Sequence, residues 1–267
     1  MTDDVRLYMF DGGTVYLPKR NFVAGVEDGA EMITTPIIWF YLTHPRGNVI
    51  IDGGNAAEVA VDAKAHWGAI TEMSTPHMLP EQAVVPALRS QGVDLGSVRW
   101  ILQTHLHLDH TGALAAIDDF PNAEVLVTRT EYEWAHAPDT LSEIGYCKKD
   151  YVKPGIPWHL LEVTDDGYDV FGDGVIRCWQ TPGHSPGHQS FEVNLPSGES
   201  FLLTGDAANT LVHLEGDALP GFMTNSTDTL RSVKKLQRLA WRAEATAVAG
   251  HDAGQWPQLR HAPEYYS

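Results

Sequence analysis

Three imidazoles and a carboxylate stand within six residues, His105-Leu-His107-Leu-Asp109-His110, directly after an apolar run, Trp100 to Thr104, that is typical of a strand. In α/β proteins, ligand-binding side chains gather where strands end. Two histidines one residue apart can converge on one metal ion, and the Asp-His pair that follows can face a second. Crowding three imidazoles together is unfavourable without a metal, so the motif predicts a metal site at a sheet edge.

The mixture of imidazole nitrogen and carboxylate oxygen suits zinc best, with manganese, iron and cobalt as competitors. Three further candidates each end an apolar run, namely His184 in Thr-Pro-Gly-His, Asp206 in Leu-Thr-Gly-Asp and His251 in Val-Ala-Gly-His. Taken singly, each is more often an ordinary residue than a ligand. Spacing alone does not pair them with the first cluster.

Short β-rich runs alternate in the later part of the chain with amphipathic helical patterns, which predicts an α/β protein with central sheets and outer helices. The expected strands are Ile37 to Leu42, Val49 to Asp52, Trp100 to Thr104, Val125 to Thr128, Ile176 to Thr181, Phe201 to Asp206 and Thr246 to Gly250. Helices are expected over Ser226 to Glu244, capped by Ser226 or Thr227, and over Pro80 to Gln91. Asp11-Gly12-Gly13 predicts a turn. No linker or repeat divides the chain, so we expect a single domain over residues 1–267.

Charge and composition exclude several classes of function. Lys and Arg total 18 against 35 Asp and Glu, a net charge of −17, which disfavours binding to nucleic acid. The N-terminal residues do not resemble a secretory signal, and the longest apolar run is far shorter than the roughly 18 residues that cross a bilayer. We therefore expect no membrane partner and a cytoplasmic location. Cys147 and Cys178 lack metal-binding or redox spacing and are expected to be reduced thiols.

The His-x-His-x-Asp-His loop, the distant histidines and the intervening aspartate together resemble the metallo-β-lactamase superfamily. This resemblance implies a four-layer αββα sandwich with two divalent metal ions at one edge. It assigns His105, His107 and His184 to the first metal, Asp109, His110 and His251 to the second, and Asp206 to a bridge between them. It also implies hydrolysis by a hydroxide that bridges the metals, with Asp109 delivering a proton to the leaving group.

Within that superfamily the chain is most similar to the N-acyl homoserine lactonases, which open the lactone ring of bacterial signals. The matching stretches extend over nearly the whole chain: Thr35 to Leu42, Ile50 to Gly53, His105 to Gly112, Arg129 to Tyr132, Thr181 to Ser190, the Leu-Thr-Gly-Asp-Ala run to Ala207, and Pro263 to Tyr265. The resemblance implies a lactonase with a small-molecule substrate, and it makes a homodimer an expectation.

One residue departs from the lactonase pattern. The family has a tyrosine three residues after the bridging aspartate, thought to donate a hydrogen bond to the lactone carbonyl, and this chain has Asn209. An Asn amide can also donate to a developing oxyanion, although it reaches less far. Asn209 is therefore a candidate catalytic residue, and Tyr146, Tyr168 or His213 are alternative donors.

Other residues are expected to support or surround the site. By resemblance, Asp52 orients site histidines, and His188 is a hydrogen-bond partner rather than a ligand. Three apolar stretches, residues 16–32, 67–79 and 211–223, are candidates for holding an acyl chain or an aromatic lactone, or for covering the core. Their large apolar residues are Phe22, Met32, Trp67, Met73, Met78, Leu211, Leu219, Phe222 and Met223. The histidines expected at the surface or in loops are His44, His66, His77, His136, His159 and His261.

Other functions stay open at this level. A different lactone, an organophosphate or a carbamate would use the same ligands, and Asn209 leaves these substrates open. A thioester hydrolase would share the ligands too, but the chain lacks the basic C-terminal segment of that group. A non-catalytic or redox metal-binding protein is the alternative outside hydrolases, and the intact Asp109-His110 pair with His251 disfavours its one-metal forms. A β-lactamase is disfavoured because Asp206 stands where many such enzymes use cysteine at the second metal.

Overall fold

Two β-sheets form the centre of the protein in a computed structural model that describes residues 4–216 and 218–267. The seven-stranded sheet has the order β4-β1-β2-β3-β5-β6-β7, and the five-stranded sheet has the order β12-β11-β10-β9-β8. The strands of the first sheet are β1 (Arg6–Pro18), β2 (Met32–Thr43), β3 (Asn48–Ile51), β4 (Thr75–His77), β5 (Val98–Leu102), β6 (Glu124–Thr128) and β7 (Trp158–Leu161). Those of the second are β8 (Tyr168–Asp169), β9 (Ile176–Gln180), β10 (Gln189–Asn194), β11 (Ser200–Leu203) and β12 (Thr246–Val248).

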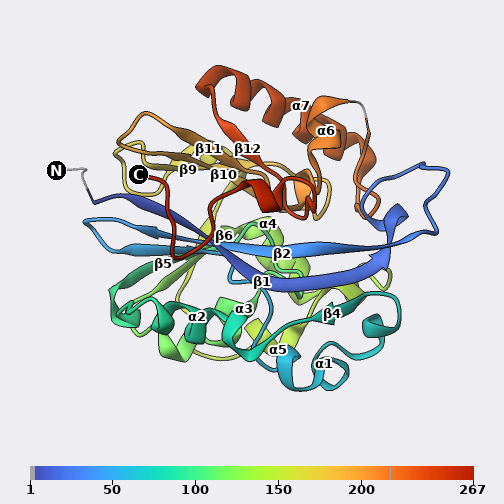
Figure 1. The fold of residues 1–267 in the computed structure, drawn as a ribbon, viewed down its shortest axis with the longest axis horizontal. Helices are drawn as coiled ribbons and strands as arrows, with labels where there is room; N and C mark the ends of the chain where they lie inside the picture. Colours follow the sequence, from blue (N-terminus) through green and yellow to red (C-terminus); the bar gives the residue numbers. More distant parts are fainter. Residues whose placement is uncertain (1–3, 217) are drawn as a thin grey trace.

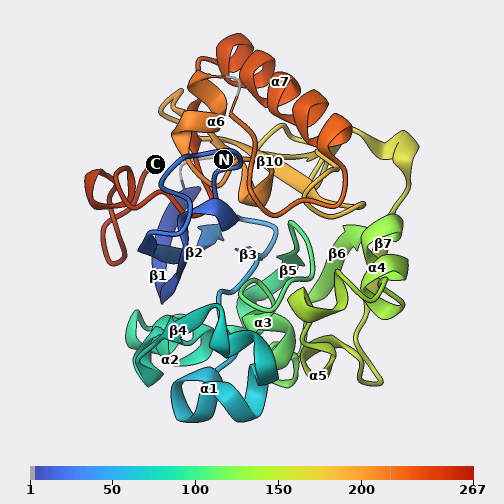
Figure 2. The ribbon, with the colours of Figure 1, turned by 90° about the vertical axis from the view of Figure 1, so that its right-hand side faces the viewer.

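Helices cover the outer faces of both sheets, which gives four layers (Figures 1 and 2). The described helices are α1 (Val59–Trp67), α2 (Val84–Ser90), α3 (Gly112–Ala115), α4 (Arg129–His136), α5 (Lys148–Tyr151), α6 (Leu211–Glu215) and α7 (Ser226–Ala243). In Figure 2, α6 and α7 lie above the second sheet, whereas α1, α2, α3 and α5 lie below the first. This is the αββα sandwich that the resemblance implied.

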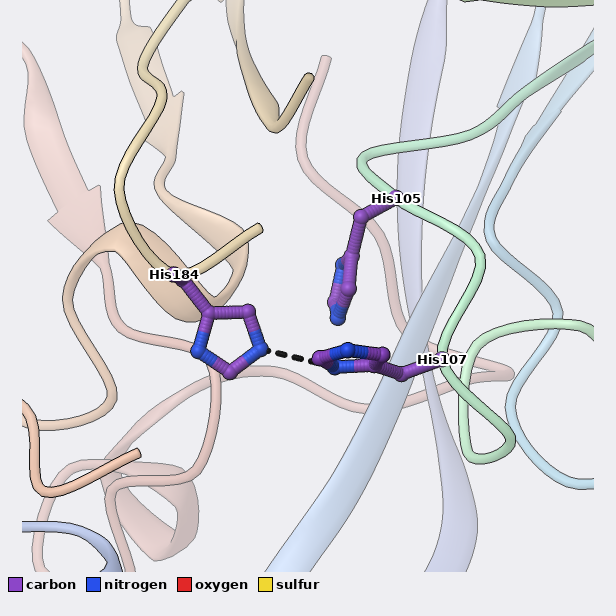
Figure 3. Close-up of side chains that lie close together, drawn as sticks. All are labelled: His105, His107 and His184. Atoms are coloured by element: carbon purple, nitrogen blue, oxygen red, sulfur yellow. Dashed lines mark hydrogen bonds between the residues drawn. The ribbon is translucent and has the colours of Figure 1, made fainter. Parts of the chain in front are cut away.

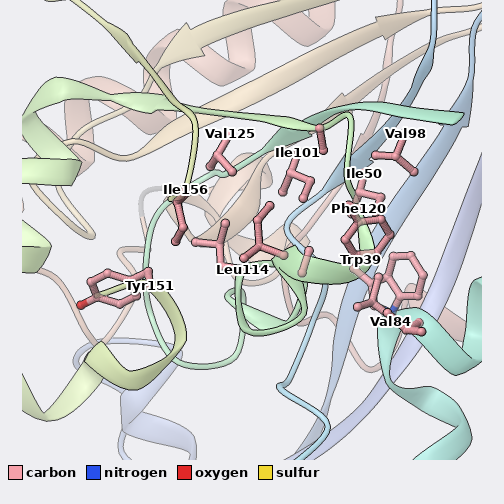
Figure 4. Packing of buried hydrophobic residues seen from close by; sticks show 14 of the residues in the cluster. Trp39, Ile50, Val84, Val98, Ile101, Leu114, Phe120, Val125, Tyr151 and Ile156 are labelled. Atoms are coloured by element: carbon pink, nitrogen blue, oxygen red, sulfur yellow. The ribbon is translucent and has the colours of Figure 1, made fainter. Parts of the chain in front are cut away.

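The apolar faces of the strands explain the layering. In β6, Val125 and Val127 belong to the cluster between the first sheet and its helices, whereas Leu126 belongs to the cluster between the sheets. Both faces of this strand are buried at its centre, so Val125 to Val127 form a continuous apolar run. Figure 4 shows the outer cluster, in which Phe120 and Leu114 pack beneath Val125 and Ile101.

Strand direction brings the functional loops to one edge. β3, β5, β6 and β7 are parallel neighbours, and β11 is parallel to β12. The carboxyl ends of parallel strands meet at the same edge of a sheet. The loops after β3 and β5 therefore open at one edge of the first sheet, and those after β11 and β12 open at one edge of the second.

Each expected strand is present, with ends shifted by a few residues. The helix expected over Ser226 to Glu244 is α7, and its cap is Asn225, whose Oδ1 accepts from Asp228 N at 3.1 Å, rather than Ser226 or Thr227. The helix expected over Pro80 to Gln91 is a 3-10 turn over Pro80–Gln82 followed by α2.

The prediction of a turn at Asp11-Gly12-Gly13 is wrong. These residues lie inside β1, where the register against β2 shifts between Asp11 and Thr14. Asp11 Oδ1 accepts a hydrogen bond from Gly13 N at 2.8 Å, so a short turn-like irregularity is absorbed as a bulge within a long strand. Within the described residues, no helix is both long and apolar enough to cross a membrane.

Candidate dinuclear metal site

The residues expected to bind metal converge at the edge where the parallel strands end. His105, His107, Asp109 and His110 follow β5, and His184 lies between β9 and β10. Asp206 follows β11 and His251 follows β12. The ligand atoms form three overlapping groups, and within each group all atoms lie within 4.8 Å of one another. The groups are His105 with His107 and His184, His105 with His110 and Asp206, and Asp109 with His110 and His251. Figure 3 shows the first group, in which His184 Nε2 lies 2.8 Å from His107 Nδ1 and the two rings are inclined by 71°.

Asp206 lies between the two groups. Its Oδ2 is 3.3 Å from His184 Nε2, whereas its Oδ1 is 3.4 Å from His110 Nε2 and 3.2 Å from His251 Nε2. One carboxylate oxygen thus faces each group, which is the placement that a bridging ligand requires. Asp109 completes the second group, with carboxylate oxygens 3.7 Å from His110 Nε2 and from His251 Nε2.

Hydrogen bonds to Nδ1 aim most of these imidazoles. His105 Nδ1 lies 2.9 Å from Thr104 Oγ1, and His110 Nδ1 lies 2.8 Å from Asp52 Oδ2. His184 Nδ1 lies 3.0 Å from the carbonyl oxygen of Phe222, and His251 Nδ1 lies 2.8 Å from that of Pro36. Each contact leaves Nε2 directed at the centre, as in metal sites where a partner on the far nitrogen selects the tautomer.

Buried atoms without partners test whether the site fits a metal. His105 Nε2, His110 Nε2 and Asp206 Oδ1 are buried and have no hydrogen-bond partner among the residues that the structure describes. His107 instead turns Nδ1 to the centre, 2.8 Å from His184 Nε2. Leaving buried polar atoms unpaired is unfavourable, and coordinated cations would satisfy these three. The donor set of imidazoles and carboxylates therefore fits two divalent metal ions.

The ionisable groups of the site shift one another's pKa values. Burial and neighbouring imidazoles lower the pKa of His105 and of His107 well below the usual value. Burial opposes charge on His110 as well, but Asp109, Asp206 and Asp52 outweigh it and raise the pKa of His110. Burial would raise the pKa of Asp206, but His251, His110 and His184 hold it well below its usual value. The centre is thus built around an ionised carboxylate.

The two residues expected to support the site do so. Asp52, at the end of β3, contacts His110 directly and accepts from Thr104 N at 2.7 Å. His188 is fully buried between Thr181 Oγ1, 2.9 Å from its Nδ1, and the amide of Asp206, which donates to its Nε2 at 3.0 Å. Burial lowers the pKa of His188 to about 3, so it stays neutral and accepts this bond. His188 thus makes the hydrogen bond to a candidate ligand that its predicted supporting role requires.

Glu131 supports the site, a role that the sequence did not single out beyond its place in the Arg-Thr-Glu-Tyr match. Its carboxylate is fully buried and accepts from Leu106 N at 3.0 Å and Ser185 Oγ at 2.6 Å. It also accepts from Tyr146 O–H at 3.2 Å and Gly187 N at 3.2 Å. Because Leu106 lies between two ligands and Ser185 follows a third, Glu131 joins the two loops that carry the first group.

A cavity of about 420 Å3 opens beside the centre. His107, Asp109, His184, Asp206 and His251 contribute to its lining, and its apolar walls are Val15, Leu17, Phe22, Trp67, Ile70, Met73, Leu108, Ile144 and Phe222. Of the apolar residues expected to line a site, Phe22, Trp67, Met73 and Phe222 do so, and Met32, Met78, Leu211, Leu219 and Met223 do not. The walls from Val15, Leu108 and Ile144 lie outside the three predicted stretches.

Of the four candidate donors, only Asn209 lines the cavity. It is 1% exposed, and its Oδ1 has no hydrogen-bond partner within residues 4–216 and 218–267. The hydroxyl of Tyr146 is engaged by Glu131, Tyr168 lies in the edge strand β8, and His213 is buried with Nδ1 accepting from Thr210 N at 3.2 Å.

The expectation that six other histidines lie at the surface or in loops holds only in part. His77 is exposed, and His44 and His261 lie in loops, although the ring of His44 is buried against Phe171 with centroids 3.8 Å apart. His66, His136 and His159 lie instead in α1, α4 and β7 and are partly buried.

Comparison with known proteins agrees with this geometry. The model of the metallo-beta-lactamase superfamily matches residues 35–251, which include all seven candidate ligands. The chain belongs to the metallo-beta-lactamase superfamily. Among its curated members, N-acyl homoserine lactonase AttM of Agrobacterium fabrum is 46% identical over 99% of both chains. N-acyl homoserine lactonase AiiA of Bacillus thuringiensis subsp. kurstaki is 28% identical over 97% of this chain and 98% of the relative.

A solved superfamily structure has the same architecture. An N-acyl homoserine lactone hydrolase with the product N-hexanoyl-L-homoserine bound at its catalytic metal centre matches with a TM-score of 0.85 and 26% identity, over 98% of each chain. The αββα fold is thereby confirmed over nearly the whole chain.

Proposed function

We propose that this protein is a metal-dependent hydrolase that opens the lactone ring of N-acyl homoserine lactones. The observation that carries the proposal is a seven-donor centre, with Asp206 facing both ligand groups, at the base of an apolar cavity. Full-length similarity to curated lactonases supports the same activity. Two divalent metals held there would lower the pKa of bound water and polarise the substrate carbonyl.

The metal ligands follow the sequence-based assignment. His105, His107 and His184 would hold the first ion, Asp109, His110 and His251 the second, and Asp206 would join them. We infer that zinc is the ion in both positions, because imidazole nitrogen and carboxylate oxygen are ligands that it prefers.

Two residues of the cavity are suited to act on the substrate. Asp109 has an 18% exposed carboxylate, against 8% for Asp206. It can accept a proton from the attacking water and pass it to the leaving ring oxygen. Asn209 can donate its amide hydrogen to the carbonyl oxygen as negative charge develops there. The apolar walls would exclude water around the acyl chain.

The test is metal content together with turnover of a lactone panel. We expect two metal ions per chain and ring opening, seen by product mass, for short- and long-chain acyl homoserine lactones. Burying one methylene contributes about 0.8 kcal/mol, so KM should fall by up to about fourfold per methylene until the apolar walls are filled. A different result would be that the protein binds two metals yet turns over only simple γ- or δ-lactones, an aromatic lactone or an organophosphate. That result would contradict the proposed substrate and indicate that Asn209 changes the substrate specificity.

The sequence-based expectations of a single domain over residues 1–267, a homodimer and a cytoplasmic location stay predictions. Size-exclusion chromatography with light scattering would show whether the protein is a homodimer in solution.

A further inference from the structure

A second group of metal-ligating side chains lies outside the seven-residue centre. His66, in the last turn of α1, has Nε2 2.8 Å from Asp150 Oδ1 and 3.5 Å from Cys147 Sγ. The three donor atoms all lie within 4.8 Å of one another, and Cys147 and Asp150 are buried. We propose that His66, Cys147 and Asp150 form a third metal site, which takes a thiophilic divalent cation such as zinc.

The geometry of the group is close to that of a tetrahedral site. Bonds of about 2.3 Å to sulfur and 2.0 Å to nitrogen place tetrahedral donors about 3.5 Å apart, which is the separation of Cys147 Sγ and His66 Nε2. Asp150 Oδ1 needs to move outward by a few tenths of an ångström to reach the same spacing. Water would occupy the fourth position.

The charges of the group also suit a divalent cation. The Cys147 thiolate and the Asp150 carboxylate supply two negative charges, and His66 supplies a neutral imidazole once metal replaces its proton. Binding therefore releases the thiol proton and the proton that His66 shares with Asp150. Lys149 adds a positive charge nearby, since its Nζ donates to the carbonyl oxygens of Ala65 at 2.9 Å and His66 at 3.3 Å. We therefore expect weaker binding here than at the seven-residue centre.

The third site joins two walls of the cavity. Cys147 packs in one apolar cluster with Trp67 and Leu108, which both line the cavity. Asp150 Oδ2 accepts a hydrogen bond at 2.7 Å from Thr111 Oγ1, directly after His110. A cation held here would fasten α1 to the segment that leads into α5, so it should raise Tm and alter KM for long-chain substrates more than kcat.

Cobalt(II) titration of the metal-depleted full-length protein tests the site without depending on lactone turnover. The seven-residue centre contains no sulfur, so thiolate-to-cobalt charge-transfer absorption reports a cysteine ligand. Cys178 is not expected to contribute, because it is 1% exposed in β9 and burial raises the pKa of its thiol far above the usual value. The wild-type protein should bind three equivalents, and the charge-transfer absorption should grow with the third.

Three variants decide the assignment. Cys147→Ser should bind two equivalents and show no charge-transfer absorption, whereas Cys178→Ala should match the wild type. His66→Gln should weaken the third equivalent at least tenfold, and circular dichroism verifies the fold of each variant. Two equivalents without charge-transfer absorption in the wild type, or absorption that persists in Cys147→Ser, would overturn the proposal. Lactone turnover of Cys147→Ser with two metals tests the proposed function separately.

Discussion

The carboxylate of Asp52 lies 2.8 Å from Nδ1 of His110, and the same carboxylate accepts from Thr104 Oγ1, which lies 2.9 Å from Nδ1 of His105. One side chain therefore orients a histidine in each ligand group. Asp52 has φ of 66°, a left-handed backbone conformation that Asp and Asn tolerate better than most residues.

Asp52→Asn should weaken metal binding without unfolding the protein, because Asn accepts the same backbone conformation but removes the charge that holds His110. Loss of such an orienting partner commonly lowers metal affinity about 10- to 100-fold. Competition with a chromophoric chelator measures the affinity directly. Affinities equal to those of the wild type would show that the Asp52–His110 contact does not organise the ligands.

Glu131→Gln should lower the free energy of unfolding by about 2–4 kcal/mol. Hydrogen bonds to a charged group contribute about 1.5–3 kcal/mol each, and the NH2 group of the glutamine would face hydrogen-bond donors that now bind a carboxylate oxygen. Urea denaturation measures the loss. Glu133→Gln, exposed on the same helix α4, is the matched control and should change stability by less than about 0.5 kcal/mol. Similar values for both variants would contradict the role of Glu131 in joining the loops.

Asn209→Ala should lower kcat for lactone hydrolysis about 100-fold if its amide stabilises the developing oxyanion, since one such donor commonly contributes 100- to 1,000-fold. KM should change little, because the contact strengthens mainly in the transition state. Steady-state kinetics on an acyl homoserine lactone separates these parameters. A change confined to KM would instead assign Asn209 to substrate binding.

Removing the metals should abolish turnover and lower Tm, because the buried imidazoles and Asp206 would then lack partners. Dialysis against a chelator followed by calorimetry measures the shift, and restoring two equivalents of zinc should restore both properties. Full activity in a preparation shown by mass spectrometry to be metal-free would refute a metal-dependent hydrolase.

His66 should make stability pH-dependent on the alkaline side. Its hydrogen bonds with Asp150 and with Cys147 raise its pKa to about 10 in the folded protein, against about 6.5 in an unfolded chain. A group whose pKa is higher in the folded protein stabilises the fold fully at pH values below its pKa in the unfolded chain. This contribution disappears as the pH rises through its pKa in the folded protein. The Tm difference between the wild type and His66→Gln, with only two metal equivalents present, should therefore shrink from about pH 6.5 to 10. A constant difference across this range would contradict a charged His66.

Sequence alone identified the four candidate ligands from His105 to His110, because they are neighbours along the chain and follow an apolar strand. It also identified the α7 pattern, since helical periodicity is local. The resemblance, rather than spacing, supplied His184, Asp206 and His251. They reach the same point because the strands that precede them, β9, β11 and β12, end at the edge where β5 ends.

Only tertiary structure revealed the other relationships. Glu131 meets Ser185 across 54 positions, and His66 meets Cys147 across 81. Contacts at such separations leave no periodic signal in a single sequence, because they depend on how layers pack rather than on local backbone preference. For the same reason, Asp11-Gly12-Gly13 formed a bulge rather than a turn: pairing of β1 with β2 on both sides overrode the local preference.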